Sequence, residues 1–136
     1  MQNILITGSQ GYIGSLLIQK VVENKQLFNK IVALDIRMPS AENTLEGVTY
    51  VEEDIRSENI EKIVAEHKID TIVHLAAIIS IAGTHTVQFE YDVDVNGSTN
   101  LMNAAIKHGV KRFIHSSSGA AYGYWPSNVD LLLTED

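Results

Sequence analysis

Three glycines near the N-terminus have the spacing of a loop that holds a phosphate. Gly8, Gly11 and Gly14 stand in the segment Thr-Gly-Ser-Gln-Gly-Tyr-Ile-Gly, after an apolar run and before an amphipathic one. Gly8 lets the chain turn off a strand, Gly11 lets the main chain approach a pyrophosphate, and Gly14 lets a helix lie close to a sheet. Free N–H groups at the start of that helix would face the anion. Ordinary turns also contain glycines, but this context favours dinucleotide binding.

Asp35 is a second polar position of interest, about 20 residues after Gly14 at the end of another apolar run. Its carboxylate could accept hydrogen bonds from both hydroxyls of an adenosine ribose and would repel a 2′-phosphate. Arg37 could instead accommodate that phosphate. Asp35 could also be an ordinary turn residue. The pattern favours NAD, and NADP stays open as the less favoured cofactor.

The strands that must position these residues are short, continuous apolar runs rich in Ile and Val. Such runs are typical of strands buried on both faces of a parallel sheet. They occur at residues 4–6, 31–34, 48–51, 69–75 and 110–114. With right-handed crossovers, this order predicts an α/β fold, a doubly wound parallel sheet of the Rossmann type with strand order 3-2-1-4-5.

Three helical patterns separate most of these runs, and residues 39–47 form a loop instead. The first pattern places apolar residues on one face, namely Ile13, Leu16, Leu17 and Val21. The second follows Ser57 as a predicted N-cap, with Ile60, Ile63 and Val64 on its inner face. The third repeats through Val87, Tyr91, Val95, Met102 and Ile106. It predicts a helix to Lys107, with Gly109 as a left-handed cap.

Composition excludes several classes of protein. The 136 residues are 45% hydrophobic, enough for one domain with a core of its own. The absence of cysteine excludes a disulfide scaffold, a thiolate zinc site and a cysteine nucleophile. A formal net charge of −7 and scattered basic residues argue against nucleic acid as a partner. No metal-ligand spacing, signal peptide or membrane-spanning run is present, so we expect no metal, no membrane partner and a cytoplasmic location.

Five segments in order carry a resemblance to a known family. They are residues 7–14, Asp35, Glu53-Asp54-Ile55-Arg56, Val73-His74-Leu75-Ala76-Ala77, and residues 116–123 with the sequence Ser-Ser-Ser-Gly-Ala-Ala-Tyr-Gly. With these motifs the chain resembles the extended short-chain dehydrogenase/reductase family, the NAD-dependent sugar-nucleotide epimerases and dehydratases. The resemblance covers essentially all 136 residues.

The resemblance implies a role for each matching residue. Tyr12 and Ile13 would lie against the pyrophosphate, Asp54 and Ile55 would flank the adenine, and residues 75–77 would pass under the nicotinamide. Ser118 would be the catalytic residue that bonds the reacting oxygen. Motifs and resemblance together predict these cofactor-binding residues: Gly8, Gly11, Tyr12, Ile13, Gly14, Asp35, Ile36, Arg37, Asp54, Ile55, Leu75, Ala76, Ala77 and Ser116.

Two histidines and one aspartate could carry further chemistry. His74 and His115 lie in or at the end of apolar runs, which favours structural histidines with satisfied hydrogen bonds over catalytic bases or metal ligands. Asp94 stands where the family usually has asparagine. Its charge would alter the electrostatics near the cofactor, or its carboxylate would bond the main chain as the asparagine does.

The largest departure from the family concerns its catalytic base, the tyrosine of a Tyr-x-x-x-Lys pair. Tyr122 and Tyr124 are followed at the fourth position by Pro126 and Asn128, and no lysine follows Lys111. In the family a nearby lysine lowers the pKa of that tyrosine from about 10. We therefore expect residues 1–118 to form the NAD-binding domain, 119–136 to be an irregular tail, and the chain to be truncated before the sixth strand and the substrate lobe.

The leading functional hypothesis is the cofactor domain of an enzyme that oxidises, epimerises or dehydrates a small molecule at a carbinol carbon, such as a nucleotide sugar. The alternatives are a non-catalytic NAD(H)-sensing module, or a different nucleotide ligand on the same fold. Residues 80–86 do not identify the substrate. The family commonly dimerises through the helix that corresponds here to residues 86–107. Residues 110–114 should form an open sheet edge with an exposed apolar patch, so we expect self-association. Residues 119–136 should be either poorly ordered or recruited to cover that patch.

Overall fold

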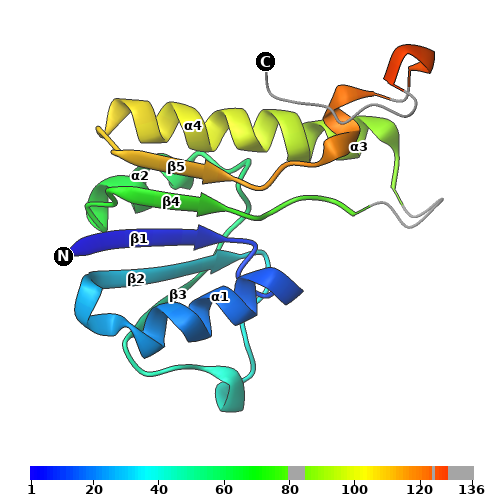
Figure 1. Cartoon of the computed structure of the whole chain (residues 1–136). Helices are drawn as coiled ribbons and strands as arrows, with labels where there is room; N and C mark the ends of the chain where they lie inside the picture. Colours follow the sequence, from blue (N-terminus) through cyan, green and yellow to red (C-terminus); the bar gives the residue numbers. More distant parts are fainter. Residues whose placement is uncertain (80–84, 124, 129–136) are drawn as a thin grey trace.

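A five-stranded parallel sheet forms the centre of the molecule (Figure 1). The computed structural model describes residues 1–79, 85–123 and 125–128. Its strands are β1 (Gln2–Thr7), β2 (Phe28–Asp35), β3 (Val48–Glu52), β4 (Thr71–His74) and β5 (Arg112–His115). They lie in the order β3-β2-β1-β4-β5, which confirms the predicted topology.

Helices cover both faces of this sheet, as a doubly wound fold requires (Figure 1). Leu5 and Ile72 belong to a core cluster with residues of α2 (Asn59–Glu66) and α4 (Ser98–Lys107). Ile4 and Ile6, the neighbours of Leu5 in β1, belong instead to a second cluster with α1 (Tyr12–Glu23). The alternation follows from the two-residue period of a strand, so the apolar runs are buried from both sides.

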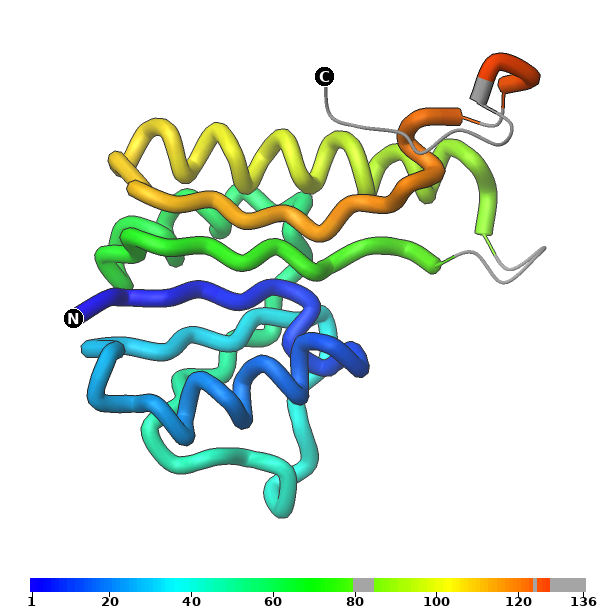
Figure 2. The backbone as a smooth tube through the Cα atoms, viewed as in Figure 1, coloured from blue at the N-terminus to red at the C-terminus, as the bar shows by residue number. Residues whose placement is uncertain are grey.

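The third helical pattern forms one unbroken helical segment, which runs along the sheet in Figure 2. It consists of α3 (Val87–Tyr91), a π-helical stretch (Asp92–Gly97) and α4. Thr86 caps its start by accepting a hydrogen bond from Phe89 N to Oγ1 at 3.2 Å. Gly109 follows its end with φ +67°, the left-handed conformation that the sequence predicts.

The apolar residues from which the sequence predicts the long helix lie on its exposed face, opposite the face that is buried. Val87, Tyr91, Val95, Met102 and Ile106 are all exposed, and Val87 and Ile106 are at least 80% accessible. The buried residues are instead Val93, Gly97, Ser98, Leu101, Ala104 and Ala105. Small side chains let the helix approach the sheet closely, but they contribute little to an apolar pattern. The apolar pattern in the sequence therefore marks the exposed face of the helix instead of the buried one.

Two further expectations on helices need correction. Ile13 and Leu16 of α1 are exposed, whereas Ile18 and Val21 are buried. The N-cap of α2 is Glu58, one residue after the predicted Ser57, although Ser57 Oγ does accept a hydrogen bond from Asn59 N at 3.1 Å. Short 3₁₀ turns complete the described elements at Lys25–Leu27, Ala41–Asn43, Gly119–Tyr122 and Pro126–Asn128.

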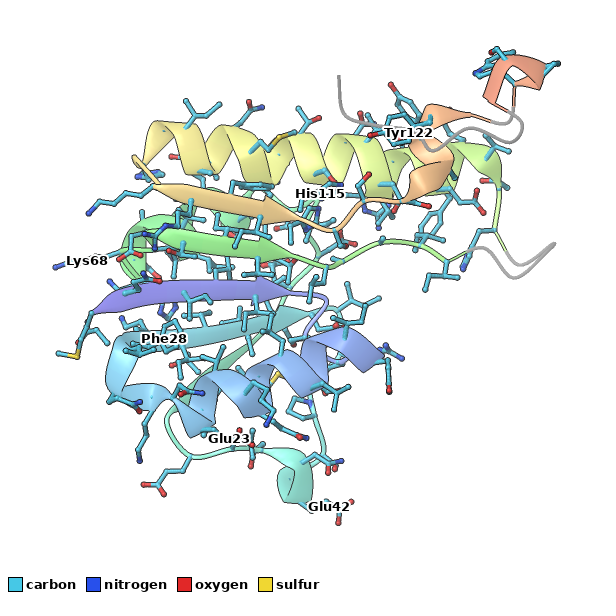
Figure 3. The ribbon with its side chains drawn as sticks, viewed as in Figure 1. Glu23, Phe28, Glu42, Lys68, His115 and Tyr122 are labelled. Atoms are coloured by element: carbon cyan, nitrogen blue, oxygen red, sulfur yellow. The ribbon has the colours of Figure 1, made fainter. Side chains whose placement is uncertain are left out.

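Strand β5 forms one edge of the sheet and, in the described part of the chain, pairs with β4 alone. Ile114 is 54% exposed, although its register partner Val73 is buried in the α1-side cluster. His115 ends the strand and is also exposed (Figure 3). As predicted, this strand lies at an edge, with bounds of Arg112–His115 in place of 110–114. Whether the predicted tail covers it is not tested, because residues 124 and 129–136 lie outside the described residues. No described helix is long and apolar enough to span a bilayer.

Candidate dinucleotide site

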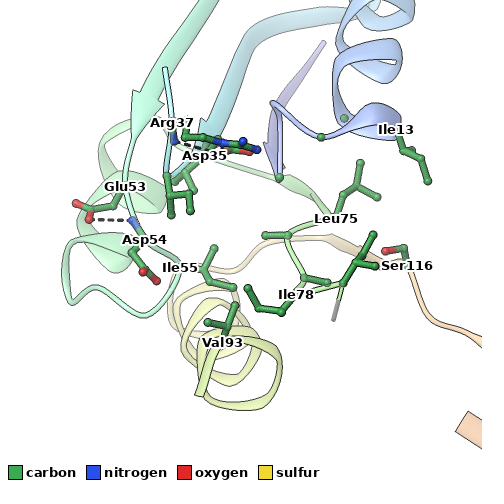
Figure 4. Close-up of a pocket in the computed structure, with 18 of the residues that line it drawn as sticks. Ile13, Asp35, Arg37, Glu53, Asp54, Ile55, Leu75, Ile78, Val93 and Ser116 are labelled. Atoms are coloured by element: carbon green, nitrogen blue, oxygen red, sulfur yellow. Dashed lines mark hydrogen bonds and ion pairs between the residues drawn. The ribbon is translucent and has the colours of Figure 1, made fainter. Parts of the chain in front are cut away.

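A cavity of about 410 Å³ opens at the carboxyl edge of the sheet (Figure 4). The strands are parallel, so their carboxyl ends meet at the same edge. Between β1 and β4 the chain order reverses, and this switch point is where doubly wound sheets bind ligands. The volume lies in the range of small-molecule pockets. The lining residues come from the ends of the strands and the segments that follow them, from the start of α1 and from the long helix.

All fourteen predicted cofactor-binding residues line this cavity. They come from the glycine loop, the end of β2, the segment after β3, the segment after β4, and the residue after β5. The predicted catalytic Ser118 is absent from the lining; its Oγ accepts a hydrogen bond from Ala120 N at 3.2 Å. The fold therefore gathers the cofactor set, and the role of each residue stays a prediction.

The glycine loop is as close-packed as the motif predicts. Gly8 has φ +69°, and a Cβ on it would lie 2.6 Å from Ala76 N. A Cβ on Gly14 would overlap the carbonyl oxygen of Gly8. Helix α1 begins directly after Gly11, so its unbonded N–H groups and positive dipole end face the cavity that these glycines keep open. This cradle fits a pyrophosphate.

Asp35 is held in place by the main chain at the end of β2. Its Oδ2 accepts a hydrogen bond from Gln10 N at 2.9 Å, and its Oδ1 accepts one from Arg37 N at 3.2 Å. The Arg37 side chain is 71% exposed and its Nε lies 3.8 Å from Asp35 Oδ1 (Figure 4). The Asp35 side chain is 8% exposed, and the two main-chain hydrogen bonds fix its orientation in the free chain.

The segment after β3 forms the opposite wall of the cavity. Arg56 donates to both carboxylate oxygens of Asp54, and this pairing holds the pKa of Asp54 below its ordinary value. The guanidinium also lies over the Phe89 ring, 5.1 Å from its centroid. Asn100 Nδ2 donates to Ile55 O at 2.8 Å and Ser57 O at 2.9 Å. The long helix therefore fixes this wall.

The segment after β4 forms an apolar floor whose main chain is held at both ends. Thr7 Oγ1 accepts hydrogen bonds from Leu75 N and Ala76 N, each at 3.3 Å. Asp94 Oδ1 accepts one from Ile78 N at 2.8 Å. Of the two expectations for Asp94, the structure thus bears out the main-chain hydrogen bond. Small side chains at Ala76 and Ala77 leave room above the floor.

His74 is fully buried and has a hydrogen-bond partner at each ring nitrogen. Its Nδ1 lies 2.7 Å from Thr7 Oγ1 and its Nε2 lies 2.8 Å from Ser98 Oγ. Burial, reinforced by the His115 ring 5.1 Å away, lowers the pKa of His74 to about 4. The prediction of a satisfied histidine is confirmed here. Across residues 1–79, 85–123 and 125–128, no three His, Asp or Glu side chains gather as a metal site.

Seven lining residues lie outside the predicted set. They are Leu34, Glu53, Arg56, Ile78, Ile79, Phe89 and Val93. Glu53 and Arg56 stand inside a segment that the sequence already singles out, so extending Asp54 and Ile55 by one residue on each side would have included them. Phe89 and Val93 come from the long helix, and only its orientation in the fold reveals that they reach the cavity.

Comparisons with known proteins identify one family. The model of the NAD dependent epimerase/dehydratase family matches residues 4–133. A UDP-glucose 4-epimerase of Halalkalibacterium halodurans is 32% identical over 122 residues, which cover 88% of this chain and 36% of that protein. A UDP-glucose 4-epimerase sequence of Klebsiella pneumoniae is 33% identical over 133 residues, covering 90% of this chain and 94% of that sequence.

A solved structure supports the same grouping. The Thermus thermophilus UDP-glucose 4-epimerase in complex with NAD superposes with a TM-score of 0.74 and 26% identity. The match covers 86% of this chain and 38% of that one, so this chain spans little more than a third of that enzyme and of the Halalkalibacterium relative. With a family model that matches nearly all of its residues, this chain belongs to the NAD dependent epimerase/dehydratase family.

Proposed function

We propose that this chain binds NAD(H) and is the cofactor-binding part of an enzyme acting at a carbinol carbon of a nucleotide sugar. One observation carries the proposal: a single cavity brings together the glycine cradle, Asp35, the Asp54 wall and the small-residue floor. Relatives named UDP-glucose 4-epimerase support the substrate class. A cytoplasmic location and the division at residue 118 stay predictions.

The chain's own residues divide the binding between them. The N–H groups at the start of α1 would hold the pyrophosphate, and Asp35 would accept hydrogen bonds from the ribose hydroxyls. The floor at residues 75–77 would support the nicotinamide, which supplies hydride transfer when bound. Ser118 would orient the reacting oxygen of the substrate, a role carried over from the family.

Titration calorimetry with NADH and NADPH tests the cofactor proposal. We expect NADH to bind more tightly, and Asp35→Ala to weaken NADH binding by about 1–3 kcal/mol because charged hydrogen bonds are lost. Glu52→Ala is the matched control, since Glu52 is an exposed acidic residue in register with Asp35 on the neighbouring strand and lies outside the cavity lining. Equal or tighter NADPH binding by the unmodified chain would contradict the role of Asp35.

Turnover is a separate question from binding. The 136 residues contain no Tyr-x-x-x-Lys pair to take the carbinol proton, so we expect the chain to bind NADH without oxidising or epimerising a nucleotide sugar. Reduction of NAD, followed by absorbance, measures net oxidation of a UDP-sugar, and conversion of one UDP-sugar into its epimer, followed by chromatography, measures epimerisation. Detectable turnover by the chain alone would mean that another residue acts as base.

Self-association forms the last part of the proposal. The long helix exposes five apolar side chains on one face, and β5 exposes Ile114 at the open edge of the sheet. Such surfaces favour contact with a second copy. Light scattering at micromolar concentration should report a dimer, and Met102→Glu on the exposed face should shift it toward monomer. Leu16→Glu, at a similarly exposed leucine on α1, is the control; a monomeric unmodified chain would contradict the proposal.

A further inference from the structure

A chain of buried hydrogen bonds crosses the molecule beneath the cavity. It runs from Thr7 at the end of β1 through His74 at the end of β4 to Ser98 in the long helix, with O···N distances of 2.7 and 2.8 Å. Ser98 Oγ then donates to the carbonyl oxygen of Asp94 at 2.6 Å. Thr7, His74 and Ser98 are all buried. Three elements that are far apart in the sequence are thus joined through one imidazole.

The direction of every hydrogen bond in this chain is fixed by its ends. The Asp94 carbonyl can only accept, so the single Ser98 hydroxyl hydrogen points to it, and Ser98 Oγ must accept from His74 Nε2–H. A neutral ring then has a bare Nδ1, which accepts the Thr7 hydroxyl hydrogen. The lone pairs of Thr7 Oγ1 remain for the N–H groups of Leu75 and Ala76.

The groups around the ring support the neutral form. Among the described residues, the His74 ring has hydroxyl partners and no carboxylate partner. Asp94 directs its carboxylate to Ile78 N, and the neighbouring rings are His115 at 5.1 Å and Phe113 at 6.0 Å on β5. A protonated ring would donate from Nδ1 as well, and the Thr7 hydroxyl hydrogen would lose its acceptor.

The geometry next to the chain links it to the ligand cavity. Gly8 follows Thr7 and is so close to the floor that a Cβ would lie 2.6 Å from Ala76 N. Ala76 and Leu75 themselves line the cavity. Leu75 N also donates to Thr7 O at 3.2 Å, whereas Ala76 N donates to Thr7 Oγ1. The position of Ala76 under the glycine loop therefore depends on the orientation of the Thr7 hydroxyl, which the His74 ring sets.

We propose that His74 is a positioning residue. Its neutral form, with the proton on Nε2, makes the Thr7 hydroxyl donate to the ring, and Thr7 Oγ1 then accepts from the main chain of the floor. Through His74 the floor, which would lie under the nicotinamide, is thus held by hydrogen bonds to the long helix, an arrangement that we call the lock. The effect on a bound cofactor rests on the proposed NAD(H) binding. The lock itself is a property of the free chain and can be measured without a ligand.

The first test uses the unmodified 136-residue chain. Long-range ¹⁵N–¹H correlation spectra at pH 7 assign which ring nitrogen of each histidine carries a proton, and His74→Asn identifies the His74 signals. We expect a neutral His74 with its proton on Nε2. A proton on Nδ1, or a doubly protonated ring, would overturn the proposal.

The second test asks whether Ser98 influences a main-chain group that it does not touch. We expect Ser98→Ala to speed amide hydrogen exchange at Ala76 about 10-fold, because one hydrogen bond of the chain is worth about a factor of ten. The Ile72 amide, also near the middle of the sheet, serves as an internal reference for global stability. Unchanged exchange at Ala76 relative to Ile72 would mean that the contacts are local packing only.

Cofactor binding completes the experiment and separates the two proposals. Ser98→Ala should weaken NADH binding about 10-fold, Thr7→Val similarly, and Thr7→Ser should restore most of the affinity because it keeps the hydroxyl. Thr49→Val is the matched control for Thr7→Val, because Thr49 is an exposed threonine of β3 outside the cavity lining. If the unmodified chain fails to bind NADH, the proposed function fails and the tautomer and exchange results still decide the lock; normal NADH binding by Thr7→Val refutes the positioning role.

Discussion

The two halves of the cavity are built from different chemistry. On the half where we propose that the adenosine binds, called the adenosine half, Asp35 and Asp54 are already oriented by main-chain amides and by Arg56. On the half where we propose that the nicotinamide binds, called the nicotinamide half, the floor at residues 75–79 is apolar. Its main-chain N–H groups donate hydrogen bonds to Thr7 Oγ1 and Asp94 Oδ1. In the proposed binding mode, cofactor selectivity would therefore depend on these charged side chains, and placement of the nicotinamide ring would depend on the buried hydrogen bonds.

The glycine loop joins the two halves, so a change there has the largest expected effect. A Cβ at Gly14 would overlap the Gly8 carbonyl oxygen, and main chain cannot move away as a flexible side chain can. Gly14→Ala should cost about 3 kcal/mol of unfolding free energy and abolish NADH binding. Urea denaturation and calorimetry measure both. Gly119→Ala is the control, because a Cβ there would meet nothing within 4 Å; a Gly14→Ala chain that binds normally would show that the cradle is loose.

His74, beneath the nicotinamide half, should make the free energy of unfolding depend on pH. His74 has a pKa of about 4 in the folded chain and 6.5 as its ordinary value. Between these values the unfolded chain binds a proton that the folded chain does not, so stability falls as pH drops from 6.5 to 4. The full loss is about 3 kcal/mol.

Urea denaturation at pH 7 and pH 5 measures about 2 kcal/mol of this loss, because the fall continues to pH 4, and His74→Asn should remove that part of the pH dependence. His67, whose pKa is also lowered by burial, contributes in the same window, so the difference between the two chains is the quantity to compare. The lowered pKa values of Asp54 and Glu53 affect stability mainly below about pH 4.5, outside the measured range of pH 5 to 7. An equal pH dependence in both chains would contradict a buried, neutral His74.

The adenosine half should respond more weakly, because each of its contacts lies nearer to water. Asn100→Ala removes two hydrogen bonds to the Ile55 and Ser57 carbonyls and should cost about 1–2 kcal/mol of stability. NADH binding should weaken by less than the Asp35→Ala change causes. Asn103→Ala, an exposed asparagine about one turn along the same helix, is the control. If both variants behave alike, the long helix does not hold the adenosine wall.

The same contrast explains which parts of the site the sequence could predict. Gly8, Gly14 and Asp35 are predictable because their local conformations depend on neighbours in the chain, and because parallel strands bring their ends to one edge. The partnership of His74 with Ser98, and of Arg56 with Phe89, depends on how the long helix faces the sheet. That orientation follows from small buried residues such as Gly97, Ala104 and Ala105, which carry a weak hydrophobic signal.

Arg37 should produce the smallest effect and is the sharpest probe of selectivity on the adenosine half. Its side chain is 71% exposed and its Nε lies 3.8 Å from Asp35, so the ion pair is worth about 0–1 kcal/mol. The main-chain amide of Arg37 supplies the stronger restraint on Asp35 and survives any substitution at this position except proline. Arg37→Ala should therefore leave the NADH dissociation constant within about twofold, since the ribose acceptor stays oriented. Any residual NADPH binding should weaken further, because the exposed cation beside Asp35 is lost.

Calorimetric titration of both cofactors into Arg37→Ala, Asp35→Ala and the double variant separates the contributions. Arg37→Ala that weakens NADH as much as Asp35→Ala would mean that the exposed guanidinium, and not the main chain, organises the adenosine half.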